Sequence, residues 1–265
     1  MGSRSIRCAT VDDYALYERF WVQLTAIDAP LGEDWWRGTY QDVLFLEDDG
    51  RTVGYAYSYV LGAEGHVGHL IVDAHARRRG VGLALMNAIA SRLRDHRCTT
   101  WSLNVEEENA GAQALYRRCG MTPRYFSQAI SIAWGATDLL PTDASIRAVI
   151  LDAANDEEVE TALAVPPGWL RRIRRRPGRT FAVASRDGKP VGVVAYEPVT
   201  SSTPLLRAET PAVARALLEV VRGAHQHRRD DVRLHIDDHP ALAAAASSIG
   251  GRVILRTLLM QGTLV

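Results

Sequence analysis

The sequence predicts an α/β protein of two similar halves, each built on a mixed, mostly antiparallel central sheet flanked by helices. Three observations support this prediction. The chain has 265 residues, which is long for one domain and comfortable for two. Strand-like alternation of apolar residues is interleaved with apolar residues at helical spacing. Segments of the first half also recur in the second, as expected after an internal duplication.

The first half begins with two helical patterns and then changes to strands. The Asp49-Gly50 pair lies between two strand-like runs and predicts a hairpin. Apolar residues recur at every fourth position from Val81, which predicts a long helix, while Asn109 and Gly120 are placed to cap and to end a later helix. In order, we expect helices at 12–24 and 32–41, a hairpin at 42–60, a strand at 66–72, the helix from 81, a strand at 99–105, a helix at 109–120 and a closing strand at 124–134.

The second half repeats the first after "GATDLLPTDAS", a stretch typical of a linker. The strand pair that starts at Asp49 matches one that starts at Asp187, at an offset of 187 − 49 = 138 residues. The strand and helix that start at Leu103 match a segment that starts at Leu234, at an offset of 234 − 103 = 131 residues. Two matches in the same order favour duplication over chance. We expect two domains, at 1–140 and 146–265.

The second copy is shorter than the first by 138 − 131 = 7 residues, at the place where the first carries "ARRRGVG". The equivalent stretch lies near 208–221 and has neither the glycine pair nor the arginine cluster. The second domain is therefore expected to be degenerate. The 131-residue offset also pairs two functional candidates with unlike residues: Asn109 with Pro240, and Tyr116 with Ser247.

Composition narrows the range of functions. Basic and acidic residues both number 31, and the resulting net charge of zero gives no reason to expect a polyanionic partner. No apolar run approaches the ~20 residues that a membrane helix needs, and the first residues lack the apolar core of a signal peptide. We therefore expect a soluble, cytoplasmic protein that binds no membrane. The cysteines are widely spaced and form no CxxC pair, so neither a disulfide framework nor a metal site is expected.

The stretch "VDAHARRRGVGLALM" joins a strand to a helix through two glycines. Glycine has no side chain, so a ligand can approach its backbone closely. The first turn of a helix presents unpaired N–H groups with partial positive charge. Such backbone binds phosphate or pyrophosphate, and neighbouring arginines strengthen the binding. The alternative is a solvated arginine run before an ordinary turn. A P-loop needs a lysine after Gly82, and a dinucleotide fingerprint needs a small residue where Leu85 stands, so both are disfavoured.

Two motifs resemble those of the GNAT superfamily of N-acetyltransferases. The family's loop signature is Gln/Arg-x-x-Gly-x-Gly/Ala at the end of its fourth strand, and the matching residues here are Arg77, Arg78, Arg79, Gly80, Val81 and Gly82. A second motif opens a helix with Asn and continues to a terminal Gly, and the matching residues are Asn109, Ala112, Leu115, Tyr116, Gly120 and Met121. The resemblance covers residues 6 to about 134, and it covers 146–265 only as a degraded copy.

This resemblance implies that the protein transfers an acetyl group from acetyl-CoA to an amine. In the family the CoA pyrophosphate binds the loop amides, here those from Arg78 to Leu83. The pantetheine arm pairs with the fourth strand, here with Leu70, Ile71 and Val72. The N–H of Leu70 would then polarise the thioester carbonyl. Asn109 would contact the cofactor arm, or it would only cap its helix.

Tyr116 matches the position of the family's general acid, next to the cofactor. A phenol of reference pKa ~10 suits the protonation of a departing CoA thiolate. The alternative for a tyrosine at this helical spacing is a place in the core. Cys119 has no His or Asp pattern beside it, so we expect direct attack by the amine and no acetyl-cysteine intermediate.

The general base must take a proton from the ammonium group of the substrate. Many relatives use a glutamate early in the fourth strand, and the matching position here holds His66, a base suited to neutral pH. Alternation predicts that His66 shares a strand face with Leu70 and Val72, with His69 on the opposite face. A surface histidine without a catalytic duty is the alternative. The rival bases, which would act through water at the end of the fifth strand, are Glu106 and Glu107.

The acceptor site is expected between the first two helices and the strand ends, where Trp21, Trp35 and Trp36 cluster in sequence. If these rings line the cleft, they favour a substrate with an apolar or planar body; otherwise they are core aromatics. The arginine run "RRIRRRPGR" at 171–179 is expected to form a solvated helix face or contacts between domains. Because no binding module accompanies it, no nucleic-acid partner is expected.

The preferred function is an acetyl-CoA-dependent N-acetyltransferase acting on a small-molecule or peptide amine, with the first domain catalytic. One alternative is a non-catalytic acyl-CoA-binding regulatory protein. Another is a module that binds nucleic acid or modifies protein, guided by the arginine run. The sequence leaves the oligomeric state open between a monomer and a homodimer.

Overall fold

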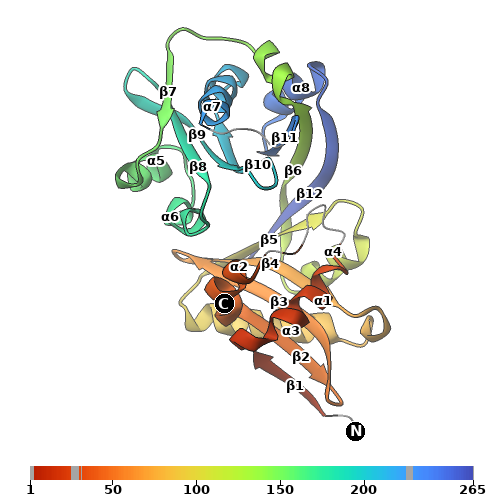
Figure 1. The fold of residues 1–265 in the computed structure, drawn as a ribbon. Coiled ribbons are helices and arrows are strands. Elements are labelled where there is room, and N and C mark those ends of the chain that lie inside the picture. The colour runs from red at the N-terminus through yellow and green to blue at the C-terminus, as the bar shows by residue number, and fades with distance from the viewer. Residues whose placement is uncertain (1–2, 25–29, 31, 225–228, 265) are drawn as a thin grey trace. The chain divides into compact units, whose positions relative to one another are not determined.

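The structure is a computed structural model, and it describes residues 3–24, 30, 32–224 and 229–264. The chain divides into two compact units (Figure 1). The first contains Met1–Arg124 and Leu259–Val265, and the second contains Tyr125–Leu258. Both units have a mixed sheet flanked by helices, as the sequence predicts. Within the described ranges, no helix has both the length and the apolar character that a membrane crossing needs.

The first unit carries its strands in the order β1-β2-β3-β4-β5, with the end of β12 beside β5. Strands β1 to β4 pair antiparallel, whereas β4 and β5 pair in parallel. The strands are β1 (Arg4–Cys8), β2 (Val43–Asp48), β3 (Arg51–Leu61), β4 (Glu64–Val72) and β5 (Thr100–Glu106). The helices are α1 (Tyr14–Trp21), α2 (Glu33–Thr39), α3 (Val81–Asp95) and α4 (Ala110–Arg118), with 3₁₀ turns at η1 (Val11–Asp13), η2 (Tyr40–Asp42) and η3 (Ala74–Ala76).

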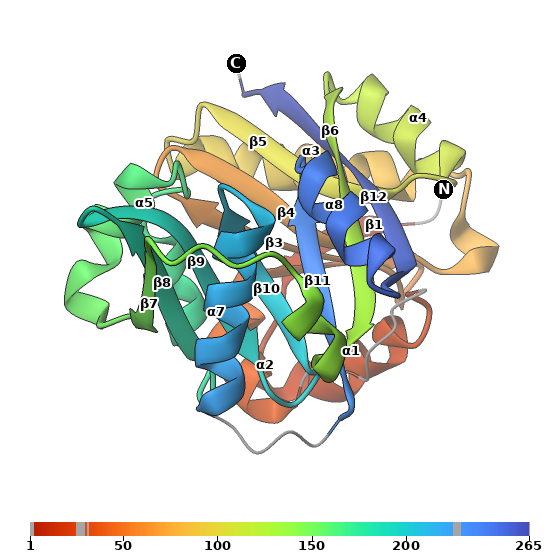
Figure 2. The ribbon, with the colours of Figure 1, turned by 90° about the horizontal axis from the view of Figure 1, so that it is seen from above.

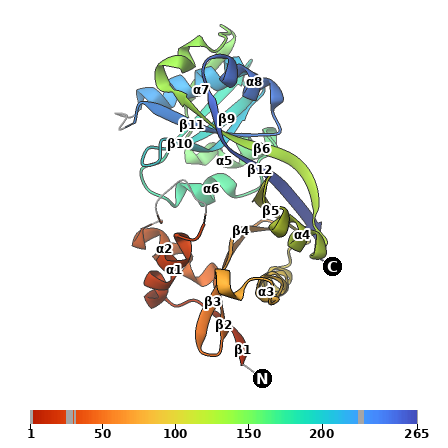
Figure 3. The ribbon, with the colours of Figure 1, turned by 90° about the vertical axis from the view of Figure 1, so that its right-hand side faces the viewer.

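Different helices cover the two faces of this first sheet (Figure 3). On β3, Tyr55 stacks with Phe20 of α1 at a ring-centroid distance of 6.0 Å. The neighbouring Gly54 faces the other way, where an added Cβ would meet Val81 and Leu85 of α3. Alternation along β3 therefore places an aromatic core under α1 and α2 on one face, here called the aromatic face, and an aliphatic core under α3 on the other.

The second unit carries its strands in the order β12-β6-β11-β10-β9-β8-β7. Helix α7 packs on one face of this sheet and α5 packs on the other (Figure 2). Helix α6 lies on the same face as α5. The strands are β6 (Thr122–Ala133), β7 (Ile146–Ile150), β8 (Thr180–Arg186), β9 (Lys189–Glu197), β10 (Ser202–Ala208), β11 (Asp231–Asp237) and β12 (Arg252–Thr263). The helices are α5 (Asp156–Ala162), α6 (Trp169–Arg174), α7 (Pro211–Gly223) and α8 (Pro240–Ser248), with 3₁₀ turns at η4 (Trp134–Leu139) and η5 (Ala153–Asn155).

The two units have a similar hairpin turn and a similar packing of the long helix on the sheet, which supports the predicted repeat. The Asp49-Gly50 turn between β2 and β3 has φ angles of 52° and 73°, and the Asp187-Gly188 turn between β8 and β9 has 51° and 76°. Positive φ at both positions is typical of two-residue hairpin turns. In each unit a strand glycine also lies under the long helix, where a Cβ would meet two aliphatic side chains: Gly54 under Val81 and Leu85, and Gly192 under Val213 and Leu217.

The helix caps correct the predicted alignment of the repeat by one residue. The side chain of Asn109 accepts a hydrogen bond from Ala112 N–H at the start of α4, and the side chain of His239 accepts one from Leu242 N–H at the start of α8. The offset between the helices is therefore 239 − 109 = 130 residues, and Asn109 corresponds to His239, not to Pro240. The turn before α8 has lost one residue that the first half retains.

The same offset carries through to the ends of these helices. Gly120 and Gly250 follow α4 and α8 with φ angles of 79° and 96°, as expected for glycines that end helices. Tyr116 then corresponds to Ala246, not to Ser247, and both of these side chains are buried. The second copy has thus kept the buried position while losing the phenol.

The last strands of the two halves are exchanged between the units. Strand β6, predicted to close the first half, lies in the second unit, where Ala133 pairs with Asp231 of β11. The last residues of β12 lie in the first unit, where Leu264 N–H donates to Thr99 C=O at 2.8 Å. Each exchanged strand covers an edge that would otherwise be unpaired. The strand predicted at 124–134 is therefore present as β6, but it lies in the second unit. The domain division at 1–140 and 146–265 stays a prediction.

We expect Gly262→Ala to destabilise the first unit through this exchanged strand. A Cβ at Gly262 would lie 2.9 Å from the Gly120 carbonyl oxygen and 2.9 Å from Trp101 Nε1, and the backbone cannot move aside as a flexible side chain can. The free energy of unfolding should fall by about 1–3 kcal/mol in denaturant titrations. In the control Gly38→Ala, the new methyl group meets open space in α2, so stability should hold or rise. Equal stability of both variants would contradict the placement of β12.

Candidate active site

The parallel strands β4 and β5 part after a few residues. They pair only as far as Val67 and Leu103. Strand β4 continues to Val72, paired on its other edge with β3. Among the residues that the structure describes, the edge of 68–72 that faces β5 has no strand partner. Backbone groups on such an edge can pair with an extended ligand.

The loop after β4 presents further backbone at the start of α3. Gly80 precedes the helix with a φ of 83°, and an added Cβ there would meet no described heavy atom within 4 Å. Gly82 lies in the first turn, where a Cβ would be 3.0 Å from Leu115 Cδ2 of α4. Gly80 is therefore needed for its backbone conformation and leaves open space, whereas Gly82 permits close packing. The N–H groups of this first turn have no acceptor within the helix.

The three loop arginines are partly fastened to the protein. Arg77 Nε donates to the carbonyl of Val72 at 3.0 Å, which ties the loop to the end of β4. Arg79 forms an ion pair with Asp48 at 3.4 Å, and its carbonyl accepts a hydrogen bond from Arg4 at 2.9 Å. All three arginines are exposed, and Arg78 has a positive φ of 60°. These contacts fix the conformation of the loop, while its arginine side chains remain exposed. The loop is therefore not a freely solvated arginine run.

A bulge in β4 changes which histidines share a face. The register pairs Tyr59 with His66 and Tyr57 with His69, and it shifts by one residue at Gly68. Tyr57 and Tyr59 lie two residues apart on β3 and so face the same way. His66 and His69 therefore both lie on the aromatic face. The prediction that they lie on opposite faces is wrong, because the extra residue of a bulge reverses the alternation.

His66 is joined to two polar side chains at the point where β4 and β5 part. Its Nδ1 lies 3.0 Å from Ser102 Oγ, and Ser102 Oγ donates to Glu64 Oε1 at 2.6 Å. The ring of Tyr59 lies over the imidazole at a centroid distance of 5.0 Å. Ser102 is only 3% exposed, so its hydroxyl is held away from bulk water. The sequence interpretation missed Ser102 and Glu64, which come together only through the parallel register of β4 and β5.

His69 belongs to the aromatic core. Its Nδ1 shares a hydrogen bond with Tyr55 Oη at 3.1 Å. Burial and, to a smaller extent, the neighbouring His66 lower the pKa of His69 to about 4. The ring is therefore neutral at physiological pH. The rings packed around it, at centroid distances of 5.0, 6.2 and 5.3 Å, are those of Trp21, Trp35 and Tyr57.

Trp36 is part of the core and lines no cleft. It is 1% exposed, and its Nε1 donates to the carbonyl of Val11 at 2.8 Å. Trp21 is also buried, whereas Trp35 is half-buried beside Tyr57. Of the three tryptophans, Trp35 is thus the one with surface left on the aromatic face.

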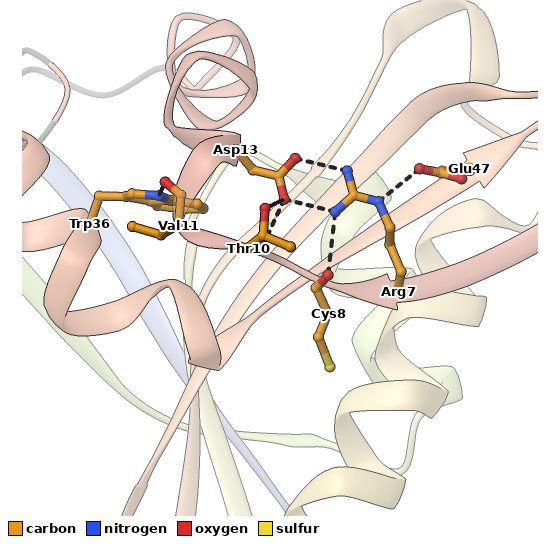
Figure 4. A network of polar contacts seen from close by, with 7 residues as sticks. All are labelled: Arg7, Cys8, Thr10, Val11, Asp13, Trp36 and Glu47. Atoms are coloured by element: carbon orange, nitrogen blue, oxygen red, sulfur yellow. Dashed lines mark hydrogen bonds and ion pairs between the residues drawn. The ribbon is translucent and has the colours of Figure 1, made fainter.

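A polar network fixes the entry to α1 next to this core (Figure 4). Arg7 donates to both carboxylate oxygens of Asp13, at 2.8 and 2.9 Å, and to Glu47 at 2.8 Å. The hydrogen bond from Arg7 is the main cause that lowers the pKa of Asp13 to about 2. Asp13 also accepts from the N–H of Thr10 at 2.7 Å. These bonds tie β1, β2 and the first turn before α1 together.

Tyr116 lies in α4 and is 7% exposed. Burial raises its pKa to about 12, so the phenol stays protonated at physiological pH. Asn109 Oδ1 accepts from the N–H of Ala112 at 3.0 Å, which confirms the predicted cap. Burial also raises the pKa of the Cys119 thiol, which disfavours a reactive thiolate.

The two glutamates at the end of β5 lie in different settings. Glu106 lies four residues after Ser102 on β5, so both side chains point to the same face of the sheet. Ser102 pairs with His66 on that face. Glu107 lies in the following turn and is exposed. Their backbone carbonyls hold the start of α4, because Glu106 C=O accepts from Asn109 N–H at 3.0 Å and Glu107 C=O accepts from Gln113 Nε2 at 2.8 Å.

Comparison with known proteins finds a family model that matches the part of the chain containing this site. The model of the family described as "Acetyltransferase (GNAT) family" matches residues 11–121, which include the splayed strands, the glycine loop and Tyr116. Residues 11–121, here called the GNAT domain after this match, are thus similar to that family. No curated protein sequence matches the chain significantly.

Solved structures show that the likeness in fold extends over both units. A GCN5-related N-acetyltransferase from Sphaerobacter thermophilus matches with a TM-score of 0.71 and 18% identity, covering 98% of this chain and 96% of that one. A tandem GNAT protein from the clavulanic acid biosynthesis pathway matches with a TM-score of 0.64 and 17% identity, covering 100% and 99%. A GCN5-related N-acetyltransferase from Anabaena variabilis matches with a TM-score of 0.64 and 13% identity, covering 99% and 73%. At these identities the likeness establishes the fold alone.

The second unit repeats the strand order of the first but has a different site. Its parallel strands β10 and β11 pair only at Ser202–Arg233 and Thr203–Leu234, so they also part early. Beyond that point Arg207 of β10 and Asp237 of β11 form an ion pair at 2.8 Å, across the gap. Two residues connect β10 to α7, where eight residues, 73–80, connect β4 to α3 in the GNAT domain.

The arginine run 171–179 is anchored within the second unit. Arg174 pairs with Asp156 at 2.9 Å, and Arg176 and Arg179 pair with Glu197 at 3.1 and 3.0 Å. Glu197 is 2% exposed, so both of its partners neutralise a buried charge. The prediction of a solvated helix face is wrong for these three arginines. Among the described residues, no group of three or more His, Cys, Asp or Glu side chains is arranged to hold a metal ion.

His69 should make the stability of the protein depend on pH. Its folded pKa of about 4 lies below the ~6.5 of an unfolded histidine, so the unfolded chain binds the extra proton between these values. The free energy of unfolding should therefore fall as the pH drops from ~6.5 towards 4, by on the order of 3 kcal/mol from this residue. Denaturant unfolding at pH 7.5 and pH 5 should show about 2 kcal/mol of this loss.

In His69→Gln this part of the pH dependence should disappear, because the amide does not titrate. The matched control is His75→Gln, since His75 is exposed, and it should keep the dependence of the parent. An unchanged pH dependence in His69→Gln would show that His69 is not its source.

Proposed function

We propose that this protein is an acetyl-CoA-dependent N-acetyltransferase that acetylates the amine of a small molecule or peptide. One observation carries the proposal: in the GNAT domain, the unpaired edge of β4 leads directly into a loop of backbone N–H groups and arginines. An extended arm that ends in a pyrophosphate, as CoA does, needs these two features in this order. The second unit has the parted strands without the loop, which supports a single cofactor site.

In this proposal the cofactor binds backbone more than side chains. The amides from Arg78 to Leu83 hold the pyrophosphate at the start of α3, and exposed arginine charge from the loop adds to its binding. Leu70 and Ile71 pair with the pantetheine arm, and the Leu70 N–H polarises the thioester carbonyl. The carbonyl of Val72 already accepts a hydrogen bond from Arg77. The loop thereby holds the end of the strand edge to which the pantetheine arm would bind.

Tyr116 is the proposed general acid. A phenol whose pKa is raised to about 12 by burial is protonated at physiological pH and therefore has a proton to give. In the proposal it gives this proton to the thiolate that leaves as the thioester breaks. Asn109 caps the same helix and thereby fixes the segment that carries Tyr116.

His66 is the proposed general base, with Glu106 and Glu107 as the rival candidates. Both His66 and Glu106 lie on the aromatic face of the sheet, where an acceptor would approach between the parted strands and α2. His66 is nearer to the point at which the strands part, because it pairs with Ser102 in the last paired segment. The half-buried ring of Trp35 on this face favours an acceptor with an apolar or planar body.

A panel of amines incubated with acetyl-CoA tests the function directly. Release of free CoA thiol, together with a mass increase of one acetyl group on an amine, is the expected result. The panel should contain amino acids, peptides, polyamines and aromatic amines. Tight CoA binding with no transfer to any amine would instead support a non-catalytic acyl-CoA-binding protein.

On any amine that is accepted, Tyr116→Phe should lower kcat by roughly 10- to 1000-fold. The ring and its packing remain while the acidic proton is lost, so the affinity for acetyl-CoA should barely change. Tyr40→Phe, on a half-buried tyrosine of η2, is the control and should keep the parent rate. Parent-like kcat in Tyr116→Phe would remove the phenol from the mechanism.

Calorimetric titration should find one CoA site per chain, because the second unit has no glycine loop and an ion pair across its parted strands. Gly82→Glu should abolish this binding, since it crowds Leu115 and adds negative charge at the helix start. Gly38→Glu, which adds the same charge in open space, should bind CoA normally. Two equivalent sites per chain would refute the proposed loss of function in the second unit.

A further inference from the structure

Three side chains on β4 and β5 form a hydrogen-bonded series at the apex of the parted strands. Glu64 Oε1 accepts from Ser102 Oγ at 2.6 Å, and Ser102 Oγ lies 3.0 Å from Nδ1 of His66. The parallel register, Glu64 beside Thr100 and His66 beside Ser102, brings them together. The proposed cofactor and acceptor chemistry uses neither Ser102 nor Glu64.

The direction of each bond follows from counting protons. A carboxylate only accepts hydrogen bonds, so the single hydroxyl proton of Ser102 points to Glu64. The serine oxygen can then only accept from the histidine. Nδ1 of His66 must therefore carry a proton, and in the neutral ring Nε2 holds the lone pair. The opposite tautomer would set the Nδ1 lone pair against a lone pair of Ser102.

We propose that Ser102 and Glu64 are positioning residues that hold His66 in the Nδ1–H tautomer, with Nε2 as the atom that takes the proton of the acceptor amine. This inference rests on the proposed function. The bond from Nδ1 to Ser102 exists in both the neutral and the protonated ring, so His66 takes up a proton without reorganising its partners. The Glu64 carboxylate, one serine away, attracts the positive charge that forms on the ring.

The proton balance of the transfer is complete with these groups. The ammonium group of the substrate gives one proton to His66 Nε2, and the free amine attacks the acetyl carbon. As the new C–N bond forms and the C–S bond breaks, Tyr116 gives its proton to the thiolate. The second proton of the amine nitrogen and the proton on His66 then leave to solvent, from which Tyr116 is protonated again. No proton moves through Ser102, whose bond to Glu64 stays intact throughout.

The internal repeat offers a comparison at the same place in the second unit. There, Ser202 and Arg233 are the paired residues at the start of the parted strands, in the positions of His66 and Ser102. Ser202 Oγ shares a hydrogen bond with Thr200 Oγ1 at 2.7 Å. The fold of these strands therefore does not require the series of Glu, Ser and His, which is confined to the GNAT domain.

The full chain labelled with ¹⁵N-histidine tests the proposal without reference to activity. Two-bond ¹H–¹⁵N couplings distinguish the tautomers, and His66→Gln identifies the His66 signals by their loss. In the parent protein, at a pH where the ring is neutral, we expect Nδ1–H. Glu64→Gln can reverse the serine hydroxyl, and Ser102→Ala removes the acceptor, so both variants should shift His66 towards Nε2–H.

Kinetics on an accepted amine provide the second readout. In Glu64→Gln and Ser102→Ala we expect kcat to fall by roughly 10- to 100-fold, while KM for acetyl-CoA changes less than about twofold, because the loop is untouched. Ser102→Thr keeps a hydroxyl and should restore both the tautomer and the rate. The control is Ser58→Ala: Ser58 is a serine of β3 that is 2% exposed and pairs with Val67, and it should match the parent.

An Nε2–H tautomer in the parent protein would overturn the proposal, and so would an unchanged tautomer in both Glu64→Gln and Ser102→Ala. A tautomer that shifts while kcat stays at the parent value would also overturn it, and would move the base to Glu106 or Glu107. Absence of acetyl transfer in a parent protein with the Nδ1–H tautomer would refute the proposed function and leave the hydrogen-bonded series standing.

Discussion

The separation of β4 from β5 beyond Val67 is the constraint on which the rest of the site depends. If β5 paired with β4 along its whole length, the backbone groups of residues 68–72 on that edge would be used in strand–strand hydrogen bonds. Because the strands part, that edge is left for a ligand, and the loop from Arg77 to Gly80 meets it at one end. At the other end, the last paired residues hold Ser102 against His66. One change of strand direction thus sets up the proposed cofactor site and the proposed base.

The two halves show what a GNAT fold needs and what its site adds. Both keep the hairpin turn, the strand glycine under the long helix, and the early parting of the parallel strands. The second unit bridges its parted strands with Arg207 and Asp237, has a two-residue connection where the loop would be, and replaces the phenol of Tyr116 with Ala246. The shared features are turns, packing contacts and strand pairings that belong to the fold. The features confined to the first unit are those that the proposed chemistry requires.

Local signals in the sequence were sufficient for the elements and for the loop. Turn residues such as Asp49-Gly50 and the cap Asn109 act over a few residues, and their patterns predict the right structure. The bulge at Gly68 was not predictable from the alternation of apolar residues. A single extra residue changes the face on which later side chains lie, but it does not produce a recognisable pattern in the sequence. Ser102 and Glu64 lie 38 residues apart and meet only through parallel pairing. The strand exchange was hidden for a similar reason, since β6 and β12 have equivalent patterns and either could follow β5.

The central claim is that the edge of β4 and the loop before α3 together hold CoA. Backbone amide NMR spectra of the full chain, recorded during titration with CoA, test it most directly. We expect the largest shifts at the amides of residues 68–72 and 78–83, with the amides of 204–213 in the second unit unchanged. Shifts confined to 204–213, or saturable CoA binding that leaves 78–83 unperturbed, would contradict the account.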